Sequence, residues 1–163
     1  MTVQVRSARG GHGSALSELK LYQRSAGVGM PQGADLVVVA IDANCSPWAQ
    51  ARNEIEESIG TALRPRAAIA CPEPHIERWY LADPDSVFTV VGARPNPGRR
   101  KCDRNRYKKL LADTVKAGGH PTPLGGIEFA SELVLAMDLY RAGKAERSLK
   151  DFVDRVRDLL RAD

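Results

Sequence analysis

Two short apolar segments, each followed by an acidic residue, constrain the fold of this chain more than any other feature. Residues 36–41 (LVVVAI) are apolar throughout and end at Asp42, and residues 67–71 (AAIAC) are followed closely by Glu73. Strands that are apolar on both faces are typical of a parallel sheet covered by helices. Since functional groups collect at the carboxyl ends of such strands, we expect Asp42 and Glu73 at one edge of the sheet.

The remaining segments predict an α/β fold in which a mostly parallel, Rossmann-like sheet is flanked by helices. Residues 2–8 alternate apolar and polar side chains, which indicates a strand near a sheet edge, and residues 87–91 indicate a strand or an extended segment. We expect a single domain over residues 1–163, with an α/β core at about 1–92 and a basic loop and helical part at 93–163. Helices are predicted at residues 14–22, 47–63, 75–82, 103–116, 129–140 and 149–160.

Composition narrows the class of protein. With 43% hydrophobic and 27% charged residues, the chain has the balance of a folded globular protein. No apolar run reaches the roughly 18 residues of a membrane helix, and the first residues lack the apolar core of a signal peptide, so we expect a cytoplasmic protein with no membrane partner. Cys45, Cys71 and Cys102 are odd in number and lack CxxC spacing, which favours reduced thiols and argues against a zinc site.

The positive charge is concentrated between residues 94 and 109, here named the basic segment, which has eight Lys and Arg residues and one acid. Such a local patch indicates binding to phosphate or nucleic acid, and a solvated surface is the alternative. Residues 9–14 (RGGHGS) join a predicted strand to a predicted helix, where backbone N–H groups can bind an anion; a tight turn is the alternative. The candidate phosphate-binding residues are Arg9, Gly11, Arg99, Arg100, Lys101 and Arg104.

The acidic residues are candidates for a divalent-metal site. Asp42 would be a direct oxygen ligand and Asn44 a weaker neutral one, with a turn before Pro47 as the alternative for Asn44. Glu73 and Glu77 are four residues apart, so a helix would keep them near one face, and a favourable interaction with the helix dipole is the alternative. Carboxylates that face one another repel unless a cation lies between them. The candidate metal ligands are Asp42, Asn44, Glu73 and Glu77, and the candidate catalytic residues are Asp42 and Glu77.

These residues resemble a family of bacterial proteins with a Toprim-like fold that are encoded beside ATPases in defence-type gene clusters. The resemblance covers about residues 3–91 and depends on LVVVAIDAN and on CPEPHIERWYLAD, which is similar to the family pattern Pro-Glu-x-x-x-Glu-x-Trp-x-Leu-x-Asp. It implies a parallel α/β core and a Mg²⁺ or Mn²⁺ ion held by an early glutamate and a later Asp-x-Asp. Here Asn44 occupies the second aspartate position, and we expect the family's first strand, with its glutamate, to be missing. In the Pro-Glu-x-x-x-Glu-x-Trp-x-Leu-x-Asp pattern, the residues of this chain that match after the proline are Glu73, Glu77, Trp79, Leu81 and Asp83.

Three functions are consistent with this sequence. The first, implied by the resemblance, is a Mg²⁺-dependent, nuclease-like protein that processes nucleic acid with an ATPase partner in phage defence; Arg99, Arg100 and Lys101 would hold the nucleic-acid backbone. The second is a non-catalytic module of the same fold that binds nucleic acid or a partner protein, with the acids as helix caps. The third is a nucleotide-binding enzyme that uses the glycine-rich loop. A homodimer could cover the sheet edge that a missing strand leaves open.

Overall fold

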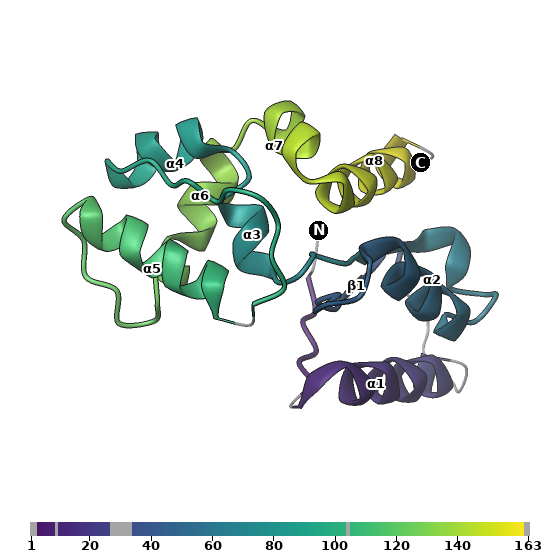
Figure 1. Ribbon diagram of the computed structural model, residues 1–163. Helices are drawn as coiled ribbons and strands as arrows, with labels where there is room; N and C mark the ends of the chain where they lie inside the picture. Colours follow the sequence, from purple (N-terminus) through teal and green to yellow (C-terminus); the bar gives the residue numbers. More distant parts are fainter. Residues whose placement is uncertain (1–2, 9, 27–33, 104, 162–163) are drawn as a thin grey trace.

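The computed structural model describes residues 3–8, 10–26, 34–103 and 105–161 (Figure 1). Arg9 and Arg104, two of the candidate phosphate-binding residues, lie outside these described residues. The described chain contains one parallel sheet of two strands, β1 (Val37–Ala40) and β2 (Ala67–Ala70), and is otherwise mostly helical. The α/β character and the helical C-terminal half are confirmed, while the sheet is smaller than the sequence predicts.

The two strands pair in parallel, beginning with Val37 opposite Ala67. Backbone hydrogen bonds continue beyond the regular strands as far as the N–H of Asn44, which donates to the carbonyl of Pro74 at 2.9 Å. Because the two segments stay side by side past both strand ends, the residues that follow β1 and those that follow β2 lie at the same edge of the sheet.

Helices cover both faces of this small sheet. On one face, α1 (Gly11–Ala26) and α2 (Trp48–Ser58) contribute Leu19 and Ile55 to a core shared with Ile69 of β2. On the other face, α8 (Arg147–Arg161) places Leu149 in a cluster with Ala70. Figure 1 shows the sheet between α1 below and α8 above. The strand β2 is buried throughout, as the parallel-sheet pattern predicts, whereas in β1 only Val39 is buried and Val38 is 49% exposed, so the prediction of two covered faces is wrong for β1.

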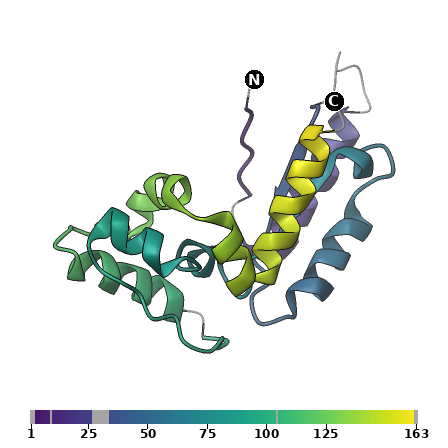
Figure 2. The ribbon, with the colours of Figure 1, turned by 90° about the horizontal axis from the view of Figure 1, so that it is seen from above.

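A second group of helices lies beside the sheet, as the view from above in Figure 2 shows. It consists of α3 (Ile76–Tyr80), α4 (Pro84–Val91), α5 (Arg106–Ala117) and α6 (Ala130–Ala136), which share a core that includes Leu81, Tyr107 and Leu133. The helix α7 (Leu139–Ala145) leads from this group to α8, and two short 3₁₀ helices lie at Arg64–Arg66 and Ile127–Phe129. The chain thus leaves the sheet through α3 and returns to it through α8.

Two predicted strands are wrong. Residues 3–8 have no regular secondary structure; Val5 is 86% exposed, and Arg6 lies over the ring of Tyr22 on α1, 5.4 Å from its centre. An alternating pattern without a hydrogen-bonding partner does not make a strand. Residues 87–91 belong to α4, which has Pro84 in its first turn and ends at Gly92, whose φ is +78°. These are the usual start and stop residues of a helix.

The predicted helix over residues 129–140 is divided in two. The helix α6 ends before Met137, and the side chain of Asp138 accepts hydrogen bonds from the backbone N–H groups of Tyr140 and Arg141 at the start of α7. An aspartate in this position satisfies the free N–H groups of a new helix and so favours a break. The helices predicted around residues 47–63, 75–82, 103–116 and 149–160 are present with shifted ends.

The cysteines also differ from the sequence-based expectation. Cys45 and Cys102 form a disulfide with their Cα atoms 5.4 Å apart, so the prediction of reduced thiols is wrong for this pair. Cys71 is a free, buried thiol, and burial together with the charges of Asp42 and Glu73 raises its pKa to about 11. The disulfide was not predictable from spacing because 57 residues separate its cysteines and only the folded chain brings them together. No helix among the described residues is long and apolar enough to cross a membrane.

Candidate functional site

The strand ends and the start of α3 form an acidic edge, defined here as Asp42, Glu73 and Glu77. Asp42 Oδ1 accepts a hydrogen bond from the N–H of Ile76 at 3.1 Å, and Oδ2 lies 3.4 Å from Nδ1 of His75. Because Ile76 is the first residue of α3, Asp42 supplies a carboxylate to the positive end of that helix. Burial raises the pKa of Asp42, while His75 and the N–H of Ile76 oppose this effect.

Glu73 has the corresponding position at the start of α2. Its Oε2 accepts a hydrogen bond at 3.2 Å from the N–H of Trp48, the first residue of that helix. Its Oε1 lies 2.8 Å from Nη1 of Arg100, which belongs to the basic segment. Each of the carboxylates that follow β1 and β2 is therefore bound to the first N–H of a helix, in agreement with the helix-capping interpretation of these residues.

Glu77 differs from the other two acids because it is only 7% exposed and only partly partnered. Its Oε1 lies 3.9 Å from Nζ of Lys108, and its Oε2 is buried without a hydrogen-bond partner. Burial raises the pKa of Tyr80, and the charges of Glu77 and Asp42 raise it further. Both carboxylates, the candidate catalytic residues, thus contribute to the electrostatic environment of Tyr80.

The arrangement does not provide an assembled metal site. Within the parts of the chain that the structure describes, no group of three or more His, Cys, Asp or Glu side chains is placed to hold a metal ion. Asp42 and Glu73 direct their oxygens to helix N–H groups and to neighbouring cationic or imidazole groups. Asn44 has a φ of +53° and donates its amide to the carbonyl of Asp42 at 3.3 Å, as a turn residue would. We therefore derive no chemical step through Mg²⁺, and metal binding by these residues stays a prediction.

The loop of the basic segment is held at three consecutive residues, one of which contacts the acidic edge. Arg100 pairs with Glu73, the backbone N–H of Lys101 donates to the hydroxyl of Tyr107 at 3.0 Å, and Cys102 is bonded to Cys45. Residues 93–103 contain no helix or strand of their own. These attachments therefore decide where the loop lies.

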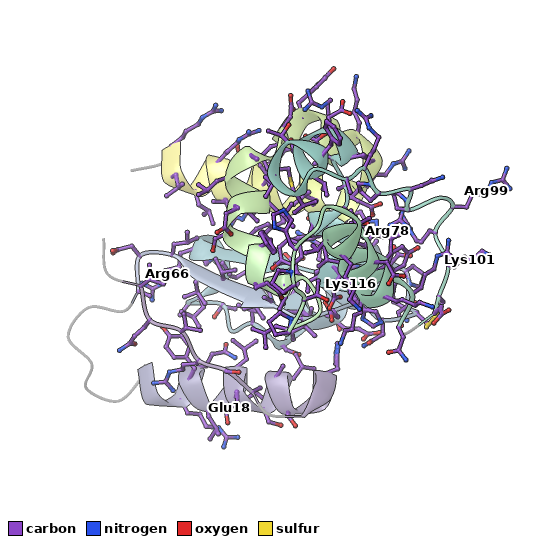
Figure 3. All side chains as sticks on the ribbon, turned by 90° about the vertical axis from the view of Figure 1, so that its left-hand side faces the viewer. Glu18, Arg66, Arg78, Arg99, Lys101 and Lys116 are labelled. Atoms are coloured by element: carbon purple, nitrogen blue, oxygen red, sulfur yellow. A yellow bond between two sulfur atoms is a disulfide. The ribbon has the colours of Figure 1, made fainter. Side chains whose placement is uncertain are left out.

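Two cations of the loop remain available to solvent. The side chains of Arg99 and Lys101 are exposed and form no ion pair with any residue that the structure describes. Figure 3 shows both of them projecting from the loop, whereas Arg78 lies within the helical core. By contrast, Arg94 pairs with Asp85. Gly11, the remaining described candidate, is exposed at the start of α1 with a φ of +40°, a conformation that favours the tight-turn interpretation.

The segment that carries the family resemblance connects the sheet to the C-terminal helices. Arg78 Nε donates to Glu146 Oε1 at 2.6 Å, and its Nη1 donates to the hydroxyl of Tyr107 at 2.7 Å. Trp79 Nε1 donates to the hydroxyl of Ser148 at 2.9 Å. Burial raises the pKa of Glu146, and Arg78 opposes this rise. Sequence reasoning missed this network: an arginine beside a tryptophan in an apolar segment was a usable signal, but nothing marked Glu146.

Asp83, the last residue of that segment, is 2% exposed and holds α7 in place. It accepts hydrogen bonds from the hydroxyl of Ser86, from the N–H of Asp138 at 2.9 Å and from two nitrogens of Arg141 at 2.9 and 3.1 Å. Burial alone would raise the pKa of Asp83, but these hydrogen bonds outweigh it and lower the pKa to about 2. Asp83 therefore has a structural role, and the hydrogen bonds of that role account for its lowered pKa.

No protein-family model, curated protein or solved structure matches this chain. The Toprim-like resemblance accordingly stays a prediction that depends on the two motifs.

Proposed function

We propose that this chain is a non-catalytic α/β module that binds nucleic acid through its basic segment. The observation that carries the proposal is the state of Arg99 and Lys101, whose charges are exposed and unpaired among the described residues while Arg100 between them is paired with Glu73. The loop that carries these two cations is held at three consecutive residues, which limits the positions that their side chains can take.

The anchoring favours binding to phosphate. A loop whose backbone is already fixed loses less conformational entropy when its side chains engage a ligand. Two outward cations without a rigid helix or strand beneath them can contact backbone phosphates but cannot present a fixed pattern of donors to base edges. We therefore expect binding without base preference, and with a strong dependence on salt.

A second candidate is the nuclease-like function that the resemblance implies, with Mg²⁺ and an ATPase partner. It is favoured by Glu77, whose buried Oε2 lacks a hydrogen-bond partner. It is disfavoured by the use of Asp42 and Glu73 as helix caps. The two candidates differ in one measurable respect: a metal site would make Mg²⁺ or Mn²⁺ raise the melting temperature of the protein.

The proposed function is tested by the double variant Arg99→Ala/Lys101→Ala, which leaves the Arg100–Glu73 pair in place. Fluorescence anisotropy with a labelled DNA duplex would be measured over a series of salt concentrations. We expect weaker binding and a plot of log K against log salt that is flatter by up to about 2, since each lost phosphate contact removes about 0.9 from the slope. The control variant, Lys20→Ala/Arg24→Ala, removes two exposed charges from α1 and should leave the slope unchanged. Equal affinity and slope for the parent and the loop variant would refute the proposal.

A further inference from the structure

We propose that the Cys45–Cys102 disulfide is a redox-controlled latch that fixes the basic segment for binding, an inference that rests on the proposed function. Cys45 lies three residues beyond Asp42, in the loop between β1 and α2, and Cys102 directly follows Lys101. The bond thus joins the loop that follows Asp42 to the residue next to Lys101.

The other attachments of the loop are weaker than a covalent bond. Arg100 lies 2.8 Å from Glu73 and 4.0 Å from Glu146, and its side chain is 41% exposed, so solvent screens these ion pairs in part and they hold the loop less firmly than a covalent bond. The second attachment is a single hydrogen bond from the backbone of Lys101 to Tyr107. Residues 93–103 contain no helix or strand, and their start is held separately, where Arg94 pairs with Asp85. Reduction of the disulfide would therefore leave residues 99–102 with the ion pairs of Arg100 and the hydrogen bond of Lys101.

The two cysteines are also placed for reversible chemistry. Both are exposed, so small thiols and disulfides can reach them, whereas Cys71 is 2% exposed and buried in the core. Their Cα separation of 5.4 Å lies in the ordinary range for a disulfide, so the bond can open and close without separating the two backbones. Exposed disulfides are the ones most often open to exchange.

The reaction is thiol–disulfide exchange with a low-molecular-weight disulfide such as oxidised glutathione. One cysteine thiolate of the protein attacks the small disulfide and releases one thiolate, which leaves a mixed disulfide on the protein. The second cysteine thiolate then attacks the protein sulfur of that mixed disulfide and releases the other small thiolate. The two protons lost by the cysteines are taken up by the two released thiolates, so two protein thiols are oxidised and one small disulfide is reduced to two thiols.

The two redox states should differ in affinity but not in charge. Reduction leaves Arg99 and Lys101 cationic, so the number of phosphates contacted and the salt slope stay nearly the same. The mobile loop must then be ordered on binding, which we expect to weaken affinity by about threefold to tenfold. This combination distinguishes the latch from the removal of the cations, which changes the slope.

The test uses the full chain equilibrated in glutathione buffers that range from reducing to oxidising. In each sample, alkylation with a maleimide reagent gives the fraction of disulfide, and the rate of trypsin cleavage after Arg99, Arg100 and Lys101 reports the mobility of the loop without any ligand. Anisotropy with the labelled duplex gives the affinity in the same samples. The double variant Cys45→Ser/Cys102→Ser should behave as the reduced parent in every buffer.

The expected result is that duplex affinity and protection from trypsin both rise with the fraction of disulfide in the parent and stay constant in the variant. Absence of a disulfide in oxidising buffer, or equal trypsin cleavage in both states, would overturn the latch whatever the duplex does. Binding that requires Arg99 and Lys101 but is equal in the two states would overturn the latch and leave the proposed function intact. Absence of binding in both states, with normal protection from trypsin, would refute the proposed function and with it the regulatory role of the bond.

Discussion

Replacement of Asp83 by Asn gives the sharpest test of whether the tryptophan-containing segment is structural. The substitution keeps the shape of the side chain and removes the charge that binds Arg141. A folded pKa of about 2 against an ordinary value of 3.8 corresponds to roughly 2.4 kcal/mol of stabilisation at neutral pH. Because the side chain of Arg141 is 50% exposed, solvent screening reduces this to roughly 1–2 kcal/mol.

The pH dependence of the loss follows from the sign of the shift. Since the folded state lowers the pKa of Asp83, the carboxylate stabilises the protein fully above the unfolded value and ceases to do so as pH falls through the folded value. The difference in unfolding free energy between the parent and the Asp83→Asn variant should therefore be constant above about pH 5 and shrink towards about pH 2. Urea unfolding at a series of pH values measures this difference directly.

A neighbouring carboxylate provides the matched control. Asp85 is exposed and pairs with the equally exposed Arg94, so Asp85→Asn should change the unfolding free energy by no more than about 0.5 kcal/mol. If Asp83→Asn costs as little as the control, or if its cost does not depend on pH, the assignment of Asp83 as the anchor of α7 is incorrect.

Two further substitutions examine the acidic edge and the buried network. Asp42→Asn should leave the unfolding free energy near neutral pH unchanged or raise it slightly, because burial raises the pKa of Asp42 and an amide oxygen can still accept the hydrogen bond from Ile76. Mg²⁺ should leave the melting temperatures of parent and variant alike unchanged; a Mg²⁺-dependent rise in the parent alone would instead favour the metal-site prediction. Arg78→Met should cost about 3 kcal/mol near neutral pH, because it leaves Glu146 buried without its partner. Burial raises the pKa of Glu146, so the folded variant favours the protonated acid. The difference in unfolding free energy between the parent and Arg78→Met, measured by urea unfolding, should therefore shrink as pH falls. A difference that grows on acidification would contradict this account.

The fold was predictable where neighbouring residues form an apolar run, a periodic pattern or a helix-capping motif. The apolar runs that became β1 and β2 are each too short and too uniform to be amphipathic helices, and they predicted a parallel pair of strands, of which β2 is buried throughout and β1 only in part. Residues 87–91, predicted as a strand or an extended segment, are bracketed by Pro84 and Gly92, which are local helix start and stop residues. The break at Asp138 likewise had a local signal, a capping aspartate within an apolar periodicity.

The sequence by itself determined the acidic residues at the strand ends, the concentration of cations in residues 94–109 and the apolar faces of the helices, because each is a property of neighbouring residues. Only the tertiary structure decided which charges meet. Glu73 lies 27 residues from Arg100, Arg78 lies 68 residues from Glu146, and Cys45 lies 57 residues from Cys102. Spacing contains no information about such partners, since parallel strand pairing and the return of α8 to the sheet bring them together. For the same reason, whether Asp42 caps a helix or binds an ion depends on the N–H of Ile76, which the folded chain places 3.1 Å from its carboxylate.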